Sequence, residues 1–185
     1  MWTLPGRPNS TYLHDQVPSF EKEPTPAMST STPIVAATDG SALRNPSGPA
    51  GWSWYVNDSC WSAGGWKSNT NNVAELTAVL EVLHATPPEQ PLTIQTDSQY
   101  AINCVTKWAH GWKRNGWIKN DKTPVKNVEI IKEIFELLQD RSVSFVWVKG
   151  HSGHPNNEAA DLRAHNAATA LDAGQQIDRG PGYKL

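Results

Sequence analysis

The sequence predicts one α/β domain built on a mixed five-stranded sheet that is flanked by helices. Two observations carry this prediction. Three strand-like runs at residues 34–38, 51–56 and 60–66 are joined by short connections, which is typical of an antiparallel meander. Helical and strand-like stretches then alternate as far as residue 171, and this order indicates a single mixed sheet with helices packed on it.

The strands of the meander are bounded by turn residues. The apolar run Ile34–Thr38 reads as a buried strand that stops just before Gly40, so Asp39 is expected where this strand runs out. Residues 43–49 are dense in Pro, Gly, Asn and Ser, which favours a loop. Asn57-Asp58 marks the tight turn between the second and third strands.

The remaining elements follow from hydrophobic periodicity. Apolar residues at i, i+3, i+4 and i+7 from Leu76 predict a helix that Thr70 or Asn71 caps and Pro87-Pro88 ends. Two further strands and three further helical stretches are expected at residues 92–96, 98–106, 128–138, 143–148 and from about 157. Residues 107–125 are rich in Lys, Trp and Gly and show no clear period.

The chain divides into a domain and two tails. Residues 1–32 carry five prolines among Ser and Thr, which predicts a disordered tail, and Met28 near its end is a candidate translation start. The folded domain is expected over residues 33–171. Residues 172–185, with Gly180-Pro181-Gly182, are expected to form a flexible C-terminal tail.

Composition excludes several classes of protein. No run approaches the roughly 18 apolar residues that span a bilayer, and the N-terminus has no secretory signal, so we expect no membrane partner. Cys60 and Cys104 fit no zinc or disulfide pattern and suit a reducing cytoplasm. Nothing in the sequence indicates an oligomer, so a monomer is expected.

Four acidic residues recur at the edges of the expected core. Asp39 and Asp97 each follow a strand, Glu75 lies on the shoulder of an apolar helix stripe, and Asp161 lies beside the alanine stripe of the last helix. Any one of them has an ordinary explanation: a helix cap, a solvated side chain, or a pair with Arg163 or Lys149. Four together predict a site for Mg²⁺ or Mn²⁺, because carboxylate oxygens are the ligands that these hard ions prefer.

Histidines follow the fifth strand in a glycine-rich loop. His151 is placed to carry protons near the carboxylates at neutral pH. A zinc site built from His151 and His154 is disfavoured, since no cysteine accompanies them and the loop is not helical.

Four motifs, in this order and with these gaps, resemble bacterial type 1 ribonuclease H over about residues 33–171. The motifs are Thr38-Asp39-Gly40-Ser41, Thr70–Glu75, Thr96–Tyr100 and Val148–Asp161. Each alone is weak, whereas the ordered set is specific.

The resemblance implies a five-stranded mixed sheet and hydrolysis of the RNA strand of RNA–DNA hybrids with two Mg²⁺ ions, leaving 5′-phosphate and 3′-hydroxyl ends. It casts Asp39, Glu75, Asp97 and Asp161 as catalytic metal ligands, and His151 as the catalytic proton carrier. Gly40 is expected at the metals as well, where its missing side chain would let the RNA backbone approach.

The resemblance also implies a set of substrate-binding residues. Residues 107–126 hold six Lys or Arg and one acid, and correspond to a basic protrusion that grips the hybrid. Packing of its tryptophans inward is an alternative for these aromatic residues. Arg44 is a further candidate phosphate contact. The candidate residues are Asn45, Thr70, Asn71, Asn72, Gln99, Trp108, Trp112, Lys113, Arg114, Trp117, Lys119 and Asn157.

Two other functions stay open on this evidence. A non-catalytic module that binds hybrids would keep the basic protrusion and lose acids, yet all four acids and His151 are present. A DNA-cutting nuclease of the same fold shares a carboxylate site, so the fold alone does not exclude it.

Overall fold

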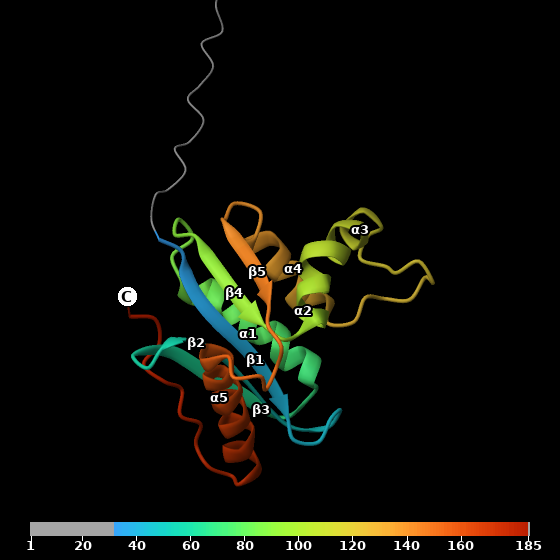
Figure 1. The fold of residues 1–185 in the computed structure, drawn as a ribbon. Coiled ribbons are helices and arrows are strands. Elements are labelled where there is room, and N and C mark those ends of the chain that lie inside the picture. Colours follow the sequence, from blue (N-terminus) through green and yellow to red (C-terminus); the bar gives the residue numbers. More distant parts are fainter. Residues whose placement is uncertain (1–31, 185) are drawn as a thin grey trace, which may run out of the picture.

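The computed structural model describes residues 32–184, and these form one five-stranded sheet in the order β3-β2-β1-β4-β5 (Figure 1). The first three strands are antiparallel, whereas the last two join in parallel. This confirms the predicted mixed sheet. The bounds are β1 (Ile34–Ala42), β2 (Gly48–Asn57), β3 (Cys60–Asn69), β4 (Leu92–Thr96) and β5 (Val143–Trp147). Met28 and all but the last residue of the predicted N-terminal tail lie outside the described residues.

Helices cover both faces of the sheet. In Figure 1, α5 (Pro155–Asp172) lies in front of β1, β2 and β3, and α1 (Asn71–Ala85) and α4 (Val128–Leu137) lie behind the sheet. A short α2 (Gln99–Asn103), a π-helical turn η1 (Cys104–Trp108) and α3 (Ala109–Arg114) follow β4. Within residues 32–184 no helix has the length and apolar character needed to cross a membrane.

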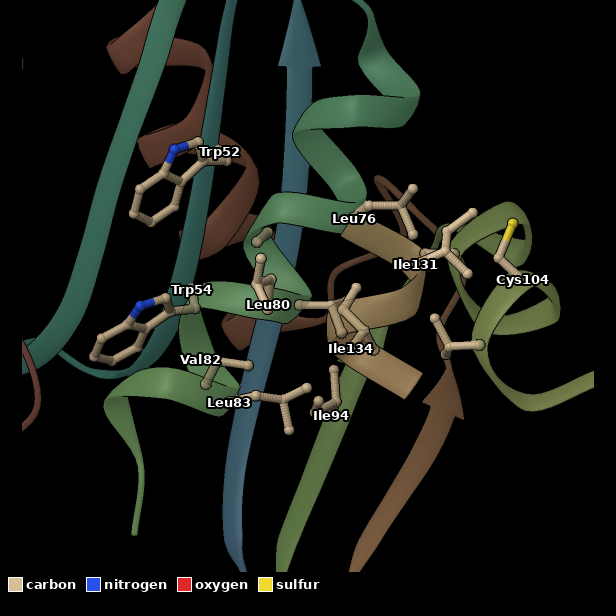
Figure 2. Close-up of a cluster of buried hydrophobic side chains, with 14 of the residues drawn as sticks. Trp52, Trp54, Leu76, Leu80, Val82, Leu83, Ile94, Cys104, Ile131 and Ile134 are labelled. Atoms are coloured by element: carbon tan, nitrogen blue, oxygen red, sulfur yellow. The ribbon is translucent and has the colours of Figure 1, made fainter. Parts of the chain in front are cut away.

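The main hydrophobic core lies between the sheet and the helices behind it. Trp52 and Trp54 of β2 pack there with apolar residues from α1, β4 and α4, among them Leu76, Ile94 and Ile134 (Figure 2). All five side chains are buried. Burying a large apolar side chain contributes about 1.5–3 kcal/mol, so this layer stabilises the packing of α1 against β1.

The other face is packed more tightly and by smaller residues. The helix α5 turns the alanine stripe Ala160, Ala164 and Ala168 toward β2, where a Cβ atom on Gly51 would overlap the Ala164 carbonyl. The Ser53 hydroxyl donates to the Ala160 carbonyl at 2.7 Å. Small residues on both sides therefore let α5 lie close to the sheet, and this brings the neighbouring Asp161 within reach of β1.

The predicted end of the first strand is wrong. β1 continues to Ala42, because Asp39, Gly40 and Ser41 pair with β2. Pairing with β4 does stop near the predicted place, at Ala37 opposite Gln95. Toward β4, Asp39 therefore lies at an open strand end, as expected. Toward β2, it lies inside a continuous ladder.

The helix α3 falls in the stretch where no period was found. Its one buried residue is Ala109, so α3 presents almost no apolar face and leaves no periodic pattern in the sequence. The left-handed backbone of Trp117, with φ of 64°, lies just beyond it in the loop that leads to α4.

The segment after α5 follows the edge of β3. The Gly182 amide donates to the Trp61 carbonyl at 3.0 Å, and the Arg179 carbonyl accepts from the Ala63 amide at 3.4 Å. Tyr183 then packs against the core. Where the sequence predicts a flexible tail, the structure has a strap that pairs with an edge strand.

Removal of residues 175–185 deletes this strap. We expect the free energy of unfolding to fall by about 2–4 kcal/mol, from the lost hydrogen bonds and the burial of Tyr183. Urea denaturation measures the change. Removal of residues 184–185 alone is the matched control and should leave the midpoint unchanged, since Tyr183 remains. Equal midpoints for both truncations would show that the strap adds no stability.

Candidate active site

Three carboxylates meet at the end of the sheet where the parallel strands stop. One oxygen from each of Asp39, Glu75 and Asp97 lies within 4.8 Å of the other two. The register of β1 against β4 runs from Ile34 opposite Leu92 to Ala37 opposite Gln95. Continuing that register brings Asp39 level with Asp97, so the pairing of the two parallel strands accounts for the first contact.

Glu75 reaches the group from the opposite face because Gly40 lacks a side chain. A Cβ atom on Gly40 would overlap the backbone of Glu75 and lie 2.7 Å from the Ala74 carbonyl carbon. The glycine thus lets α1 press against β1, rather than leaving room for an RNA backbone as the sequence suggested. Its amide donates to Asp39 Oδ1 at 2.7 Å. Whether Gly40 also binds metal stays a prediction.

Asp161 and His151 complete the cluster from the α5 side. His151 Nδ1 lies 3.5 Å from Asp161 Oδ2, and the His151 side chain is 80% exposed. The charge of Asp161 also raises the pKa of Asp39. Arg163, an alternative partner for Asp161, instead pairs with Asp58 at 3.3 Å and stacks on Tyr55 and Trp61.

Burial and mutual repulsion hold protons on this cluster. Desolvation, followed by the charges of Asp97 and Asp161, raises the pKa of Asp39 to about 8. The same two causes, with Asp39 as the main charge, raise the pKa of Glu75 well above its ordinary value. Desolvation also raises the pKa of Asp97. Like charges at this distance are stable only when protonated or answered by a cation.

The donor set fits a divalent metal ion. All three grouped ligands are carboxylates, and neither His151 nor His154 belongs to the group found in the described residues. Glu75 Oε2 is buried without a hydrogen-bond partner there. A buried, unpartnered carboxylate oxygen is costly unless it binds a cation. Oxygen ligands alone favour hard ions such as Mg²⁺ over zinc.

Two of the candidate substrate residues, Asn45 and Asn71, form a chain of contacts that leads to this cluster. The Asn45 side-chain oxygen accepts the Asn71 amide at 3.3 Å, and Asn71 Nδ2 donates to Glu75 Oε1 at 3.4 Å. The Thr70 hydroxyl caps α1, as predicted, by accepting the Val73 amide. The remaining two amide side chains, Asn72 and Gln99, are exposed.

The side chains of two other candidates interact with acidic residues of this protein. Asn157, expected to bind substrate, is buried, and it lowers the pKa of Asp97. Arg44, expected to contact phosphate, forms an ion pair with Asp172 at 2.5 Å. Trp147, which no sequence pattern singled out, and Gly150, which lies in the Val148–Asp161 motif, also lie against Asp97. Their contacts depend on the β4–β5 register, which the linear sequence does not display.

The candidate residues of the basic protrusion form a separate surface that begins at the end of η1 and continues through α3 and the loop after it. Among residues 32–184, none of its six cations forms an ion pair with an acidic side chain. Trp108 is exposed and lies 5.7 Å from Trp112, centroid to centroid. Trp117 packs edge-on against Phe135, and Lys113 lies over the same ring. Trp117 thus packs inward, while Trp108, Lys113, Arg114 and a partly exposed Lys119 line the protrusion.

The sheet order and the carboxylate cluster together define an α/β nuclease of the ribonuclease H-like fold. Residues 31–169 match the family model described as RNase H. The chain belongs to the ribonuclease H family.

Relatives of known name and structure agree with this assignment. The chain is 50% identical over 155 residues to a ribonuclease H of Tropheryma whipplei (strain Twist), which covers 83% of this chain and 96% of the relative. It is 47% identical to ribonuclease HI of Streptomyces coelicolor over 75% of this chain and 63% of that one. The crystal structure of LC9-RNase H1, a type 1 RNase H with the type 2 active-site motif, superposes with a TM-score of 0.61. That match has 26% identity and covers 82% and 78% of the two chains.

The raised pKa of Asp39 predicts a pH dependence of stability. Between its ordinary pKa of 3.8 and about 8, the folded metal-free protein keeps a proton that the unfolded chain has lost. The free energy of unfolding should therefore fall as pH rises through this window. Asp39→Asn removes the titration, so the variant should exceed the wild type by about 1–3 kcal/mol at pH 8 and approach it near pH 4.

Urea denaturation in EDTA at several pH values measures this difference. Asp140→Asn, an exposed acid outside the cluster, is the control and should follow the wild type. If the free energy of unfolding of Asp39→Asn fell with pH as steeply as that of the wild type, burial and charge repulsion would not be the causes of the raised pKa of Asp39.

Proposed function

We propose that this chain hydrolyses the RNA strand of RNA–DNA hybrids and leaves 5′-phosphate and 3′-hydroxyl ends, with two Mg²⁺ ions, or Mn²⁺ in their place. The observation that carries the proposal is the group of three carboxylates within 4.8 Å, one with a buried oxygen that has no partner. Membership in the ribonuclease H family supports the choice of substrate.

Asp39, Glu75, Asp97 and Asp161 are the proposed metal ligands. Bound Mg²⁺ would activate the attacking water and stabilise the leaving 3′-oxygen of an in-line displacement. The protein's own part is to orient these ligands. Asn71 holds Glu75 through one oxygen, and the Gly40 amide holds Asp39. Glu75 and Asp39 each keep a second carboxylate oxygen that can face an ion.

His151 is the proposed proton carrier. An imidazole ring can both accept and release a proton. Its exposed loop position and its distance of 3.5 Å from Asp161 support transfer between the cluster and solvent. We infer that His151 takes a proton from the site as product leaves.

Recognition of RNA requires neutral donors and acceptors for the 2′-hydroxyl. Asn45, Asn72 and Gln99 are exposed amides, and Asn45 is joined through Asn71 to the ligand Glu75. We propose that these side chains read the RNA strand beside the metals. A nuclease for duplex DNA has no 2′-hydroxyl to bind, so these contacts separate the two functions.

We propose that the enzyme acts as a monomer in the cytoplasm. Cys60 and Cys104 are free and buried in the described structure, which suits a reducing compartment.

A cleavage assay tests the proposed reaction. Wild-type protein with Mg²⁺ should cut the RNA of a labelled RNA–DNA hybrid, and should leave duplex RNA and duplex DNA intact. EDTA should stop the reaction. Asp97→Asn should lower the rate at least about 100-fold, because metal ligation supplies several kcal/mol of transition-state stabilisation. Asp140→Asn is the matched control. Cleavage of duplex DNA, or of no substrate, would contradict the proposal.

The basic protrusion predicts salt-sensitive binding. Each phosphate contact adds roughly 0.9 to the slope of log affinity against log salt. Lys113→Ala with Arg114→Ala should therefore weaken hybrid binding and reduce the slope by about 1–2, as measured by fluorescence anisotropy. Lys67→Ala with Lys184→Ala, near β3 at the other edge of the sheet, is the charge-matched control. Identical slopes for the two double variants would remove the protrusion from the interface.

A further inference from the structure

Trp147 is hydrogen-bonded to the main chain of Asp97. Thr96 pairs with Trp147 at the last position of the β4–β5 ladder, and the Trp147 indole Nε1 donates to the Asp97 carbonyl at 3.1 Å. The same carbonyl accepts the Gln99 amide at 3.1 Å. Two donors occupy both lone pairs of this oxygen, so the peptide group after Asp97 has little freedom to rotate.

Packing does not explain the position of Trp147. Its side chain is 49% exposed, although tryptophan usually buries most of its large ring. The exposed ring forms one wall of a recess of about 300 Å³ beside Gln99 and Lys107. The indole N–H is therefore the contact that ties this residue to the active site.

Gly150 confines the side chain of the same aspartate. A Cβ atom added to Gly150 would overlap Asp97 Oδ2 and lie 3.2 Å from its Cγ. The backbone of Gly150 is outside the left-handed region, so alanine is allowed there on conformational grounds. The obstacle to any side chain at this position is the carboxylate of Asp97.

We propose that Trp147 and Gly150 are positioning residues that hold Asp97 for metal binding, Trp147 through its main chain and Gly150 through the space beside its carboxylate. Asn157 is buried at the start of α5 and lowers the pKa of the same carboxyl group, so the segment from β5 to the start of α5 acts on Asp97 at several points. This inference rests on the proposed function only in taking Asp97 as a metal ligand.

The test compares Gly150→Ala and Trp147→Phe with the wild type. Trp147→Phe keeps an aromatic ring and removes the N–H. Gly111→Ala is the matched control for the added methyl group, since its Cβ would enter open space. Mg²⁺ is titrated into the free protein and followed by NMR through the backbone amide signals, which every variant retains. The Trp147 indole signal, identified by its loss in Trp147→Phe, is followed in addition in the other proteins. Unfolding temperatures without Mg²⁺ and the kcat and KM for hybrid are measured in parallel.

We expect Gly150→Ala to raise the Mg²⁺ concentration at half-saturation, the Mg²⁺ midpoint, about 10- to 100-fold. A change of this size is typical when a residue that orients a metal ligand is replaced. Trp147→Phe should raise it about 3- to 10-fold, with an unchanged unfolding temperature. Both variants should lower kcat with little change in KM, and excess Mg²⁺ should restore part of kcat. Gly111→Ala should bind Mg²⁺ like the wild type.

Wild-type Mg²⁺ midpoints in both variants would overturn the inference, as would a lowered unfolding temperature with an unchanged midpoint. If Gly150→Ala fails to fold, Trp147→Phe alone decides the outcome. The proposed function fails separately, when the wild type binds Mg²⁺ and does not cut the hybrid.

Discussion

The structure depends on holding three carboxylates together against desolvation and mutual repulsion. Asp39 lies within β1, Asp97 follows the end of β4 and Glu75 lies on α1, and one oxygen from each lies within 4.8 Å of the other two. Two glycines make the approach possible. Gly40 lets α1 press on β1, and Gly51 lets α5 lie close to β2. The site is thus assembled by close backbone contact, and the large core behind the sheet keeps those backbones in place.

Sequence patterns predicted the residue types of the site better than its geometry. The mixed sheet with its antiparallel meander and the cap at Thr70 follow from local signals that periodicity and turn residues carry. The burial of Asn157 and its effect on the pKa of Asp97 could not be read from the sequence, because Asp97 lies 60 residues earlier in the chain. The end of β1 and the strap on β3 depend on pairing between distant segments, which no local pattern displays.

The carboxylate cluster and the basic protrusion lie in different parts of the molecule. The carboxylates lie at the centre of the sheet, whereas the cations of the protrusion lie beyond η1 and have no acidic partners among the described residues. Trp117 and Phe135 join the protrusion to α4, so the protrusion is anchored to the core without touching the metal ligands. Affinity for a duplex and the rate of cleavage can therefore change independently in this fold.

The cluster draws its members from residues 39, 75, 97 and 161, so it spans most of the chain. During synthesis, Asp161 leaves the ribosome long after the other three acids, and it reaches them only once α5 has docked on the sheet through Ser53 and Gly51. A nascent or partly folded chain lacks this last acid. The group of four acids is therefore complete only when the last helix is docked on the sheet.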